Sequence, residues 1–212
     1  MEPARRGRTA ERAVEGARER LLESATELFI RKGYSGAAVR EIVEAAGVTK
    51  PVLYYYFRNK EGVYLVLMRE AFRGFQAVLD SLRGDTGGAA ERITRLCVRI
   101  YDLFQEKIEV ARLMYAIYYG PPQGAPFFDF DAFHERFLDA VRRLVEEGVR
   151  RGEFRRGEVE EMTWAVVGAL NVAMEIRLCH PERAFGREGL ARILGILYRG
   201  MKPEGRGKGA GR

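Results

Sequence analysis

Two short helical patterns separated by a glycine lie within residues 33–60, and they constrain the fold more than any other part of the chain. In the first, residues 38–46, apolar side chains recur at the three- and four-residue spacing of one helix face, and Gly47 interrupts the pattern. The second starts after Thr49, a residue type that caps helices. Pro51 stands in its first turn, where a proline removes no helical hydrogen bond. This stretch therefore predicts two short helices around a tight turn.

The second of these helices has one face that suits the protein interior and another that suits a polyanion. On a wheel of about 100° per residue, Leu53 and Phe57 fall together and face the first helix, whereas Pro51, Val52 and Tyr55 point away. The flanks and ends of the outer face carry Lys50, Tyr54, Tyr56, Arg58 and Lys60. This composition is unusual for a solvated face and suits DNA. A second helix set by a short glycine turn is typical of the helix-turn-helix unit, whose recognition helix enters the major groove.

The same stretch resembles the tetracycline-repressor (TetR) family of bacterial transcription regulators. The resemblance rests on Leu28-Phe29, Gly33-Tyr34, Val39 with Ile42, Ala46-Gly47-Val48, Leu53-Tyr54, and Phe57 followed by Asn59-Lys60-Glu61. These residues cover about 40 positions in order, which is more specific than a lone glycine turn. Beyond residue 65 the likeness lies only in length and helical layout.

The expected DNA contacts follow from the outer face of the second helix. We expect Pro51, Val52 and Tyr55 to meet base edges, with apolar contact to thymine methyl groups from the first two. We expect tyrosine hydroxyls and lysine ammonium groups beside them to meet phosphates. The resemblance adds Arg40, whose position meets DNA in the family, although a surface ion pair with Glu44 is an equal alternative. The full expected set is Arg40, Thr49, Lys50, Pro51, Val52, Tyr54, Tyr55, Tyr56 and Lys60.

One departure from the family concerns the start of the first helix of the motif. The family usually has a threonine or serine pair there, one member of which caps the helix and touches a phosphate. This chain has Ala37-Ala38, and Ser35 is the nearest alternative cap.

Composition limits the remaining function classes. In the chain of 212 residues, basic charge gathers at the two ends: residues 1–60 hold 12 Lys and Arg against 8 Asp and Glu, and residues 199–212 hold 5 against 1. This distribution favours a polyanion at one end of the molecule. The two cysteines, Cys97 and Cys179, and the two histidines lack metal-ligand spacing, and we expect both cysteines to be small buried hydrophobes. No nucleophile-and-base pair, phosphate loop or metal cluster indicates an enzyme or a cofactor.

The rest of the chain reads as all-α. Expected helices cover about 9–32, 59–82, 89–106, 108–119, 130–151, 158–179 and 187–200, with no strand-like alternation. We divide the chain into a DNA-binding domain at 1–62, a helical effector-binding and dimerisation domain at 63–200, and a disordered basic tail at 201–212. Residues 1 to about 10, with Arg5, Arg6 and Arg8, read as a basic arm or an ordinary disordered terminus.

The last two helices suggest a homodimer. Residues 164–174 are apolar on nearly every side, and a helix of this kind must be covered on more than one face. Two helices, about 158–179 and 187–200, from each of two subunits would form a four-helix bundle about a two-fold axis, as in the family that the chain resembles. The alternative is that both helices lie within the core of one subunit.

The resemblance also implies an inducer pocket in the body, which the sequence supports in outline. Aromatic and sulfur groups are abundant there, and two polar residues interrupt an apolar helix, as in a cleft that binds a hydrophobic small molecule. The candidates are Tyr101, Phe104, Met114, Tyr115, Tyr118, Phe137, Trp164, Asn171 and Glu175. For each of them the simpler alternative is that it fills core.

These observations predict a homodimeric repressor that a hydrophobic small molecule releases from a palindromic operator. The alternative of the same fold is a DNA-binding regulator or architectural protein without an effector. The first 20 residues are crowded with charge, unlike a signal peptide, and the longest apolar run, residues 164–174, is too short to span a bilayer. We therefore expect a cytoplasmic protein that is not embedded in a membrane.

Overall fold

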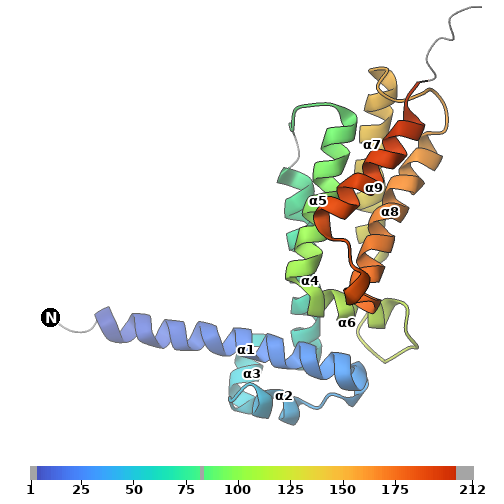
Figure 1. Ribbon diagram of the computed structural model, residues 1–212. Coiled ribbons are helices and arrows are strands. Elements are labelled where there is room, and N and C mark those ends of the chain that lie inside the picture. Colours follow the sequence, from blue (N-terminus) through green and yellow to red (C-terminus); the bar gives the residue numbers. More distant parts are fainter. Residues whose placement is uncertain (1–3, 82–83, 204–212) are drawn as a thin grey trace, which may run out of the picture. The chain divides into compact units, whose positions relative to one another are not determined.

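The computed structural model describes residues 4–81 and 84–203, with side chains from residue 16 onward. Every regular element in these ranges is helical, as predicted for the all-α class (Figure 1). The helices are α1 (Ala4–Gly36), α2 (Val39–Ala45), α3 (Lys50–Phe57), α4 (Lys60–Ser81), α5 (Ala89–Glu106), α6 (Ile108–Tyr118), α7 (Asp131–Arg150), α8 (Val159–Cys179), the 3-10 turn η1 (Pro181–Arg183) and α9 (Gly186–Met201).

The chain forms two compact units. Unit 1 comprises Met1–Arg73 with Lys107–Phe128, and unit 2 comprises Gly74–Glu106 with Asp129–Arg212. Helix α6 and the loop that follows it therefore pack with the N-terminal helices, although they are far from them in sequence. The predicted domain boundary after residue 62 assigned them to the other domain. Helix α4 contributes residues to both units.

Helix α1 differs from its prediction at both ends. It begins at Ala4, so most of the segment that we expected to be a basic arm is helical. Gly33 leaves the helical conformation with a φ of 73°, as expected of the glycine that ends the pattern, and a further turn carries the element to Gly36.

The core of unit 1 gathers around α1. Its buried residues include Leu21, Leu28, Phe29, Ile42, Leu53 and Phe57. Val39 is only half-buried, because it is the first residue of a seven-residue helix and lies at its open end. An aromatic cluster adds to this core: the ring centroids of Phe29 and Tyr34 lie 5.3 Å apart, and those of Tyr34 and Tyr64 lie 5.4 Å apart. Burial raises the pKa of Tyr64 to about 12.

Unit 2 is built around four helices. Helix α5 packs against α7 and α9, and α8 packs against the same two helices. Each contributes one apolar face to the common core, including Tyr101 from α5, Val141 from α7, Leu170 from α8 and Leu194 from α9. Cys97 is part of this core, as predicted, and burial raises the pKa of its thiol to about 12. The prediction that Cys179 is buried is wrong, because the last residue of α8 is exposed.

Helix α8 is long and apolar enough to pass a length-and-composition test for a membrane span, with a mean hydropathy of 1.3. Its position in unit 2 accounts for part of this composition. Met162, Val166 and Leu170 are buried in the core of unit 2, and core helices pass the same test.

Candidate nucleic-acid interface

Helix α3 presents the two faces that its sequence predicts. Leu53 and Phe57 are 0% and 4% exposed in the core of unit 1, whereas Tyr55 is 78% exposed. Lys50, Pro51 and Tyr54 are also exposed, and Val52 and Tyr56 are half-buried. The tyrosine rings support one another, since the centroids of Tyr55 and Tyr56 lie 5.0 Å apart with their planes nearly perpendicular. A rigid helix thus holds an aromatic and cationic surface toward solvent.

Thr49 occupies the N-cap position of α3, but its side chain forms no capping hydrogen bond. Its backbone is extended, its carbonyl accepts a hydrogen bond from the Val52 amide at 3.0 Å, and Pro51 occupies the first turn as predicted. The Thr49 hydroxyl makes no capping hydrogen bond, so the predicted side-chain cap is wrong. Because Thr49 is exposed beside Lys50, its hydroxyl is placed to contact an external acceptor.

An acidic side chain in the first turn of α2 bonds the backbone at the start of the helix. The Ala38 amide donates to Glu41 Oε2 at 3.2 Å, and the Lys32 ammonium donates to the same carboxylate. The alternative cap, Ser35, is wrong: its hydroxyl donates to the backbone carbonyl of Gln123. The bond from the Ala38 amide to Glu41 is one half of a capping box, and the other half is missing because Ala38 has no hydroxyl to accept from the amides of the first turn.

Acidification is expected to loosen this cap. The hydrogen bonds from Lys32 and Ala38 hold the pKa of Glu41 below its usual value. Since the folded-state pKa is depressed, the stabilisation is fully present above the pKa of the unfolded chain and is lost as the pH falls through the lowered folded value. Amide exchange at Ala38, corrected for the intrinsic pH dependence of exchange, is expected to lose protection in that window. In Glu41→Gln the amide should lack this pH response, and an identical response in both proteins would contradict the assignment.

Lys60 is half-buried and makes its contacts within unit 1. Its ammonium donates to the carbonyls of Tyr34 and Ala37 at 2.8 and 3.0 Å and lies 4.4 Å from the centroid of the Tyr34 ring. Burial lowers its pKa. This geometry favours a structural role over the phosphate contact that we expected, because the ammonium already has two acceptors and an aromatic face.

Arg40 shows the alternative that the sequence left open. Its Nε lies 3.5 Å from Glu44 Oε1, four residues along α2, and both side chains are largely exposed. An exposed pair of this kind contributes little to stability, so it would cost little to exchange the carboxylate for a phosphate or a base edge. The DNA contact of Arg40 stays a prediction.

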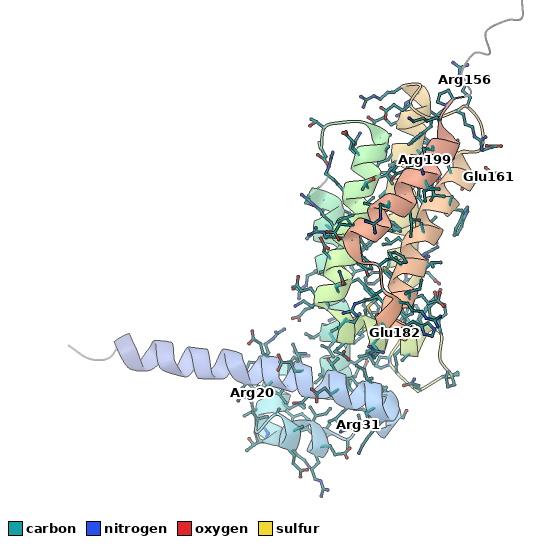
Figure 2. The ribbon with its side chains drawn as sticks, viewed as in Figure 1. Arg20, Arg31, Arg156, Glu161, Glu182 and Arg199 are labelled. Carbon is teal, nitrogen blue, oxygen red and sulfur yellow. The ribbon has the colours of Figure 1, made fainter. Side chains whose placement is uncertain are left out.

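Two arginines at the interface were not among the predicted site residues. Arg20, on α1 (Figure 2), donates from Nε to the carbonyl of Ala46 at 3.0 Å and so holds the turn between α2 and α3. No local pattern indicates this bond, because it spans 26 residues of sequence. Arg58 ends α3 with a φ of 64°, and its exposure makes it a further candidate cation beside the tyrosines.

The predicted effector residues of unit 2 fall into two groups. Tyr101, Phe104 and Phe137 are buried in its interior. Trp164, Asn171 and Glu175 share the opposite, outward side of α8: Trp164 and Glu175 are exposed and Asn171 is half-buried. Trp164 and Glu175 therefore do not share an interior cleft with the buried aromatics in the single chain, because the inner face of α8 is formed by Val166, Leu170 and their neighbours.

The other three candidates, Met114, Tyr115 and Tyr118, lie on α6 in unit 1. Met114 and Tyr115 are half-buried, and Tyr118 is exposed beside Tyr119, with ring centroids 4.7 Å apart. Exposure of Tyr118 does not fit the enclosed site that its aromatic character suggested.

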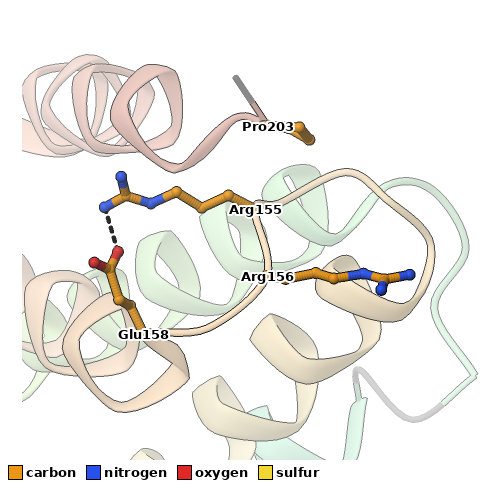
Figure 3. Close-up of a pocket in the computed structure, with 4 residues that line it drawn as sticks. All are labelled: Arg155, Arg156, Glu158 and Pro203. Carbon is orange, nitrogen blue, oxygen red and sulfur yellow. Dashed lines mark ion pairs between the residues drawn. The ribbon is translucent and has the colours of Figure 1, made fainter. Parts of the chain in front are cut away.

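A hollow of about 410 Å³ in unit 2 has a different character (Figure 3). Its lining consists of Arg155, Arg156, Glu158 and Pro203, and Arg155 forms an ion pair with Glu158. The Arg155 amide also donates to the carbonyl of Met201 at 2.8 Å. This charged, open lining does not suit the hydrophobic ligand that the sequence predicts.

Comparison with known proteins gives one consistent result. Residues 21–67 match the family model described as bacterial regulatory proteins, tetR family. The chain is 32% identical over 198 residues to YdgC of Bacillus subtilis, an uncharacterized HTH-type transcriptional regulator, covering 89% of this chain and 94% of the relative. Several other curated HTH-type regulators match over about 100 residues, and there the chain spans only 44% to 48% of the relative's length.

Solved structures agree with this assignment. The TetR family transcriptional regulator PfmR from Thermus thermophilus is 26% identical, with a TM-score of 0.68 over 90% of this chain and 98% of that chain. FadR from Bacillus subtilis, solved in complex with stearoyl-CoA, shares the fold at 16% identity, with a TM-score of 0.63 over 86% of this chain and 98% of that chain. Since the match to YdgC covers nearly both chains and the N-terminal helices carry the family motif on an exposed helix, the protein belongs to the TetR family of DNA-binding transcriptional regulators and is not an enzyme.

Proposed function

We propose that the protein is a homodimeric cytoplasmic repressor that binds a palindromic operator and leaves it when a hydrophobic small molecule binds its helical body. The observation that carries this proposal is the exposure of Tyr55 on a helix whose other side is fixed in a core by Leu53 and Phe57. On this helix the exposed ring lies among the exposed Tyr54 and the cationic Lys50 and Arg58, and this combination suits a recognition helix that faces DNA.

The outer face of α3 divides into base and phosphate contacts. Pro51, Val52 and Tyr55 are proposed to meet base edges in the major groove. Their flanking side chains, Thr49, Lys50, Tyr54 and Tyr56, with Arg40 from α2, are proposed to set the register on the phosphates. We assign Lys60 no direct contact, because its ammonium is held by Tyr34 and Ala37.

The exposed apolar faces of α8 and α9 support dimerisation. These helices lie side by side in unit 2 (Figure 1) and carry Trp164, Val172 and Ile196, each more than half exposed. Gly168 on α8 has no neighbour within 4 Å of where a Cβ would lie, so a partner helix can approach closely there. Charged residues such as Glu161 on α8 and Arg199 on α9 (Figure 2) are also exposed and suit a polar rim. Self-association through the two helices would cover these side chains.

The proposed effector is hydrophobic, with the interior aromatics of unit 2 as its contacts. Tyr101 and Phe104 stack with ring centroids 6.4 Å apart, and Phe137 lies in the same core. FadR shows that this fold accommodates a long acyl chain, and we take a fatty acyl thioester as the first compound to test. A ligand releases the operator only through higher affinity for the conformation that does not fit it.

Selection of bound sequences from random duplex DNA tests this proposal. We expect a palindrome whose half-sites lie about one helical turn, ~34–36 Å, apart, and a site preference that persists as salt rises. Stearoyl-CoA is then titrated into the complex, followed by other acyl thioesters and apolar dyes. Recovery of no preferred sequence would contradict operator binding, and a complex that no ligand weakens would favour the alternative of a regulator without an effector.

A further inference from the structure

In the loop after α6, Gln123 contacts the Tyr34–Ala37 connection, which runs from the last turn of α1 toward α2 within unit 1. Gln123 accepts a hydrogen bond at Oε1 from the Tyr34 amide at 3.1 Å, and its Nε2 donates to the Ala116 carbonyl at 3.3 Å. The Ser35 hydroxyl donates to the backbone carbonyl of the same glutamine. One residue thus joins α6, its own loop and the start of the DNA-binding motif, across almost 90 residues of sequence.

The backbone on both sides of this contact permits a close approach. A Cβ at Gly33 would lie 2.9 Å from Gln123 Oε1, and one at Gly124 would lie 3.0 Å from the Ser35 hydroxyl. Both glycines have positive φ, of 73° and 65°. The contact therefore depends on two glycines in conformations that other residues rarely adopt.

The same connection is held from a second direction by α4. Lys60 binds the carbonyls of Tyr34 and Ala37, and Gln123 binds the amide of Tyr34. Helix α2 begins at Val39, immediately beyond, and its far end is tied to α1 by Arg20. Because α2 packs directly on α3, a shift of the Tyr34–Ala37 connection would move the recognition helix with it.

We propose that Gln123 is a positioning residue for DNA binding, which acts through Tyr34 and Ser35 to fix the orientation of α2 and α3. It contacts no DNA in this scheme. The inference rests on the proposed operator binding, and it adds to the DNA-binding machinery a single residue, Gln123, more than 60 residues beyond the recognition helix.

The test compares Gln123→Met with Gln76→Met. Methionine keeps the length of the side chain and removes its hydrogen bonds. Gln76 is a matched control, since it also bonds through both ends of its amide, to Asp80 and Arg136, but lies in unit 2. The probe is the duplex recovered by selection with the wild-type protein. We expect Gln123→Met to raise the operator Kd about five- to tenfold, the scale of one or two lost hydrogen bonds, while Gln76→Met stays within about twofold, inside the usual range for surface changes.

Two further measurements separate positioning from a loss of stability. Amide exchange at Tyr34 should accelerate in Gln123→Met and not in Gln76→Met, with both variants melting within a few degrees of each other. Gln123→Glu retains the acceptor for Tyr34 and should recover most of the affinity, judged against Gln76→Glu, which carries the same added charge.

Three results would overturn the proposal. An unchanged operator Kd in Gln123→Met would show that the contact does not position the helices, and unchanged Tyr34 exchange would show that the contact does not form. Equal losses of affinity in Gln123→Met and Gln76→Met would assign the effect to stability alone. Failure of the proposed function itself is distinguishable, since it appears as an absence of site preference in the wild-type protein.

Discussion

Replacing Tyr55 by alanine is expected to raise the operator Kd about ten- to a hundredfold and to reduce the preference for operator over random DNA. The estimate corresponds to the loss of about 1–3 kcal/mol from one base-reading side chain. The fold should be unaffected, because Tyr55 is 78% exposed and the core contacts of α3 come from Leu53 and Phe57. Titration of fluorescent operator and of a scrambled duplex at fixed salt measures both quantities.

Tyr119→Ala is the matched control for this variant. Tyr119 is 74% exposed and lies in unit 1, but on the segment that follows α6 and not on α3. Removal of its ring should leave the operator Kd within about twofold, as for most surface substitutions. If Tyr55→Ala and Tyr119→Ala gave the same operator preference as the wild type, the reading face assigned to α3 would be wrong.

A charge on the exposed faces of α8 and α9 is expected to convert the protein to monomers and to weaken operator binding about a hundredfold or more. The variant is Val172→Glu with Ile196→Glu, at positions that are 51% and 58% exposed in the single chain. Two-fold symmetry would bury four unpaired carboxylates, each at a cost of several kcal/mol. A monomer also loses the second half-site, and linked sites typically exceed single-site affinity by roughly 10²–10⁴. Sedimentation and operator titration measure the two effects.

Phe127→Glu provides the control for added charge on an exposed apolar residue. Phe127 is 88% exposed and lies in unit 1, away from α8 and α9 in sequence. This variant should remain dimeric and bind the operator with nearly wild-type affinity. A double variant that stays dimeric at micromolar concentration would refute the assignment of the interface to α8 and α9.

The helix-turn-helix was predictable because its signals are local. Helical spacing, the position of Pro51 and the burial of Leu53 and Phe57 all follow from neighbours within eight residues of α3. The cap of α4 is equally local: the side-chain carbonyl of Asn59 accepts a hydrogen bond from the Gly62 amide at 2.7 Å. Local periodicity also located the helices of unit 2, since each has one strongly apolar face.

The sequence was least informative where a side chain has more than one possible partner. Lys60 follows the recognition helix and reads as a phosphate contact, but the aromatic ring and carbonyl of Tyr34 hold it inside unit 1. Trp164 reads as part of a pocket, but its place on the helix wheel puts it on the exposed side of α8. In both cases the sequence shows a side chain able to make a contact. It does not show which group that side chain contacts in the folded protein.

The sequence by itself determined that the protein is all-α, that it carries a helix-turn-helix near its N-terminus, and which face of α3 looks outward. Short-range spacing decides these properties, because helix periodicity, caps and glycine turns act within a few residues. Only the tertiary structure decided that α6 packs with the N-terminal helices, that Glu41 accepts a hydrogen bond from the Ala38 amide, and that Gln123 accepts one from the Tyr34 amide. Some of these contacts join segments that are far apart in the chain, and others depend on which of several possible donors or acceptors lies nearest. A local sequence pattern contains no information on these distances.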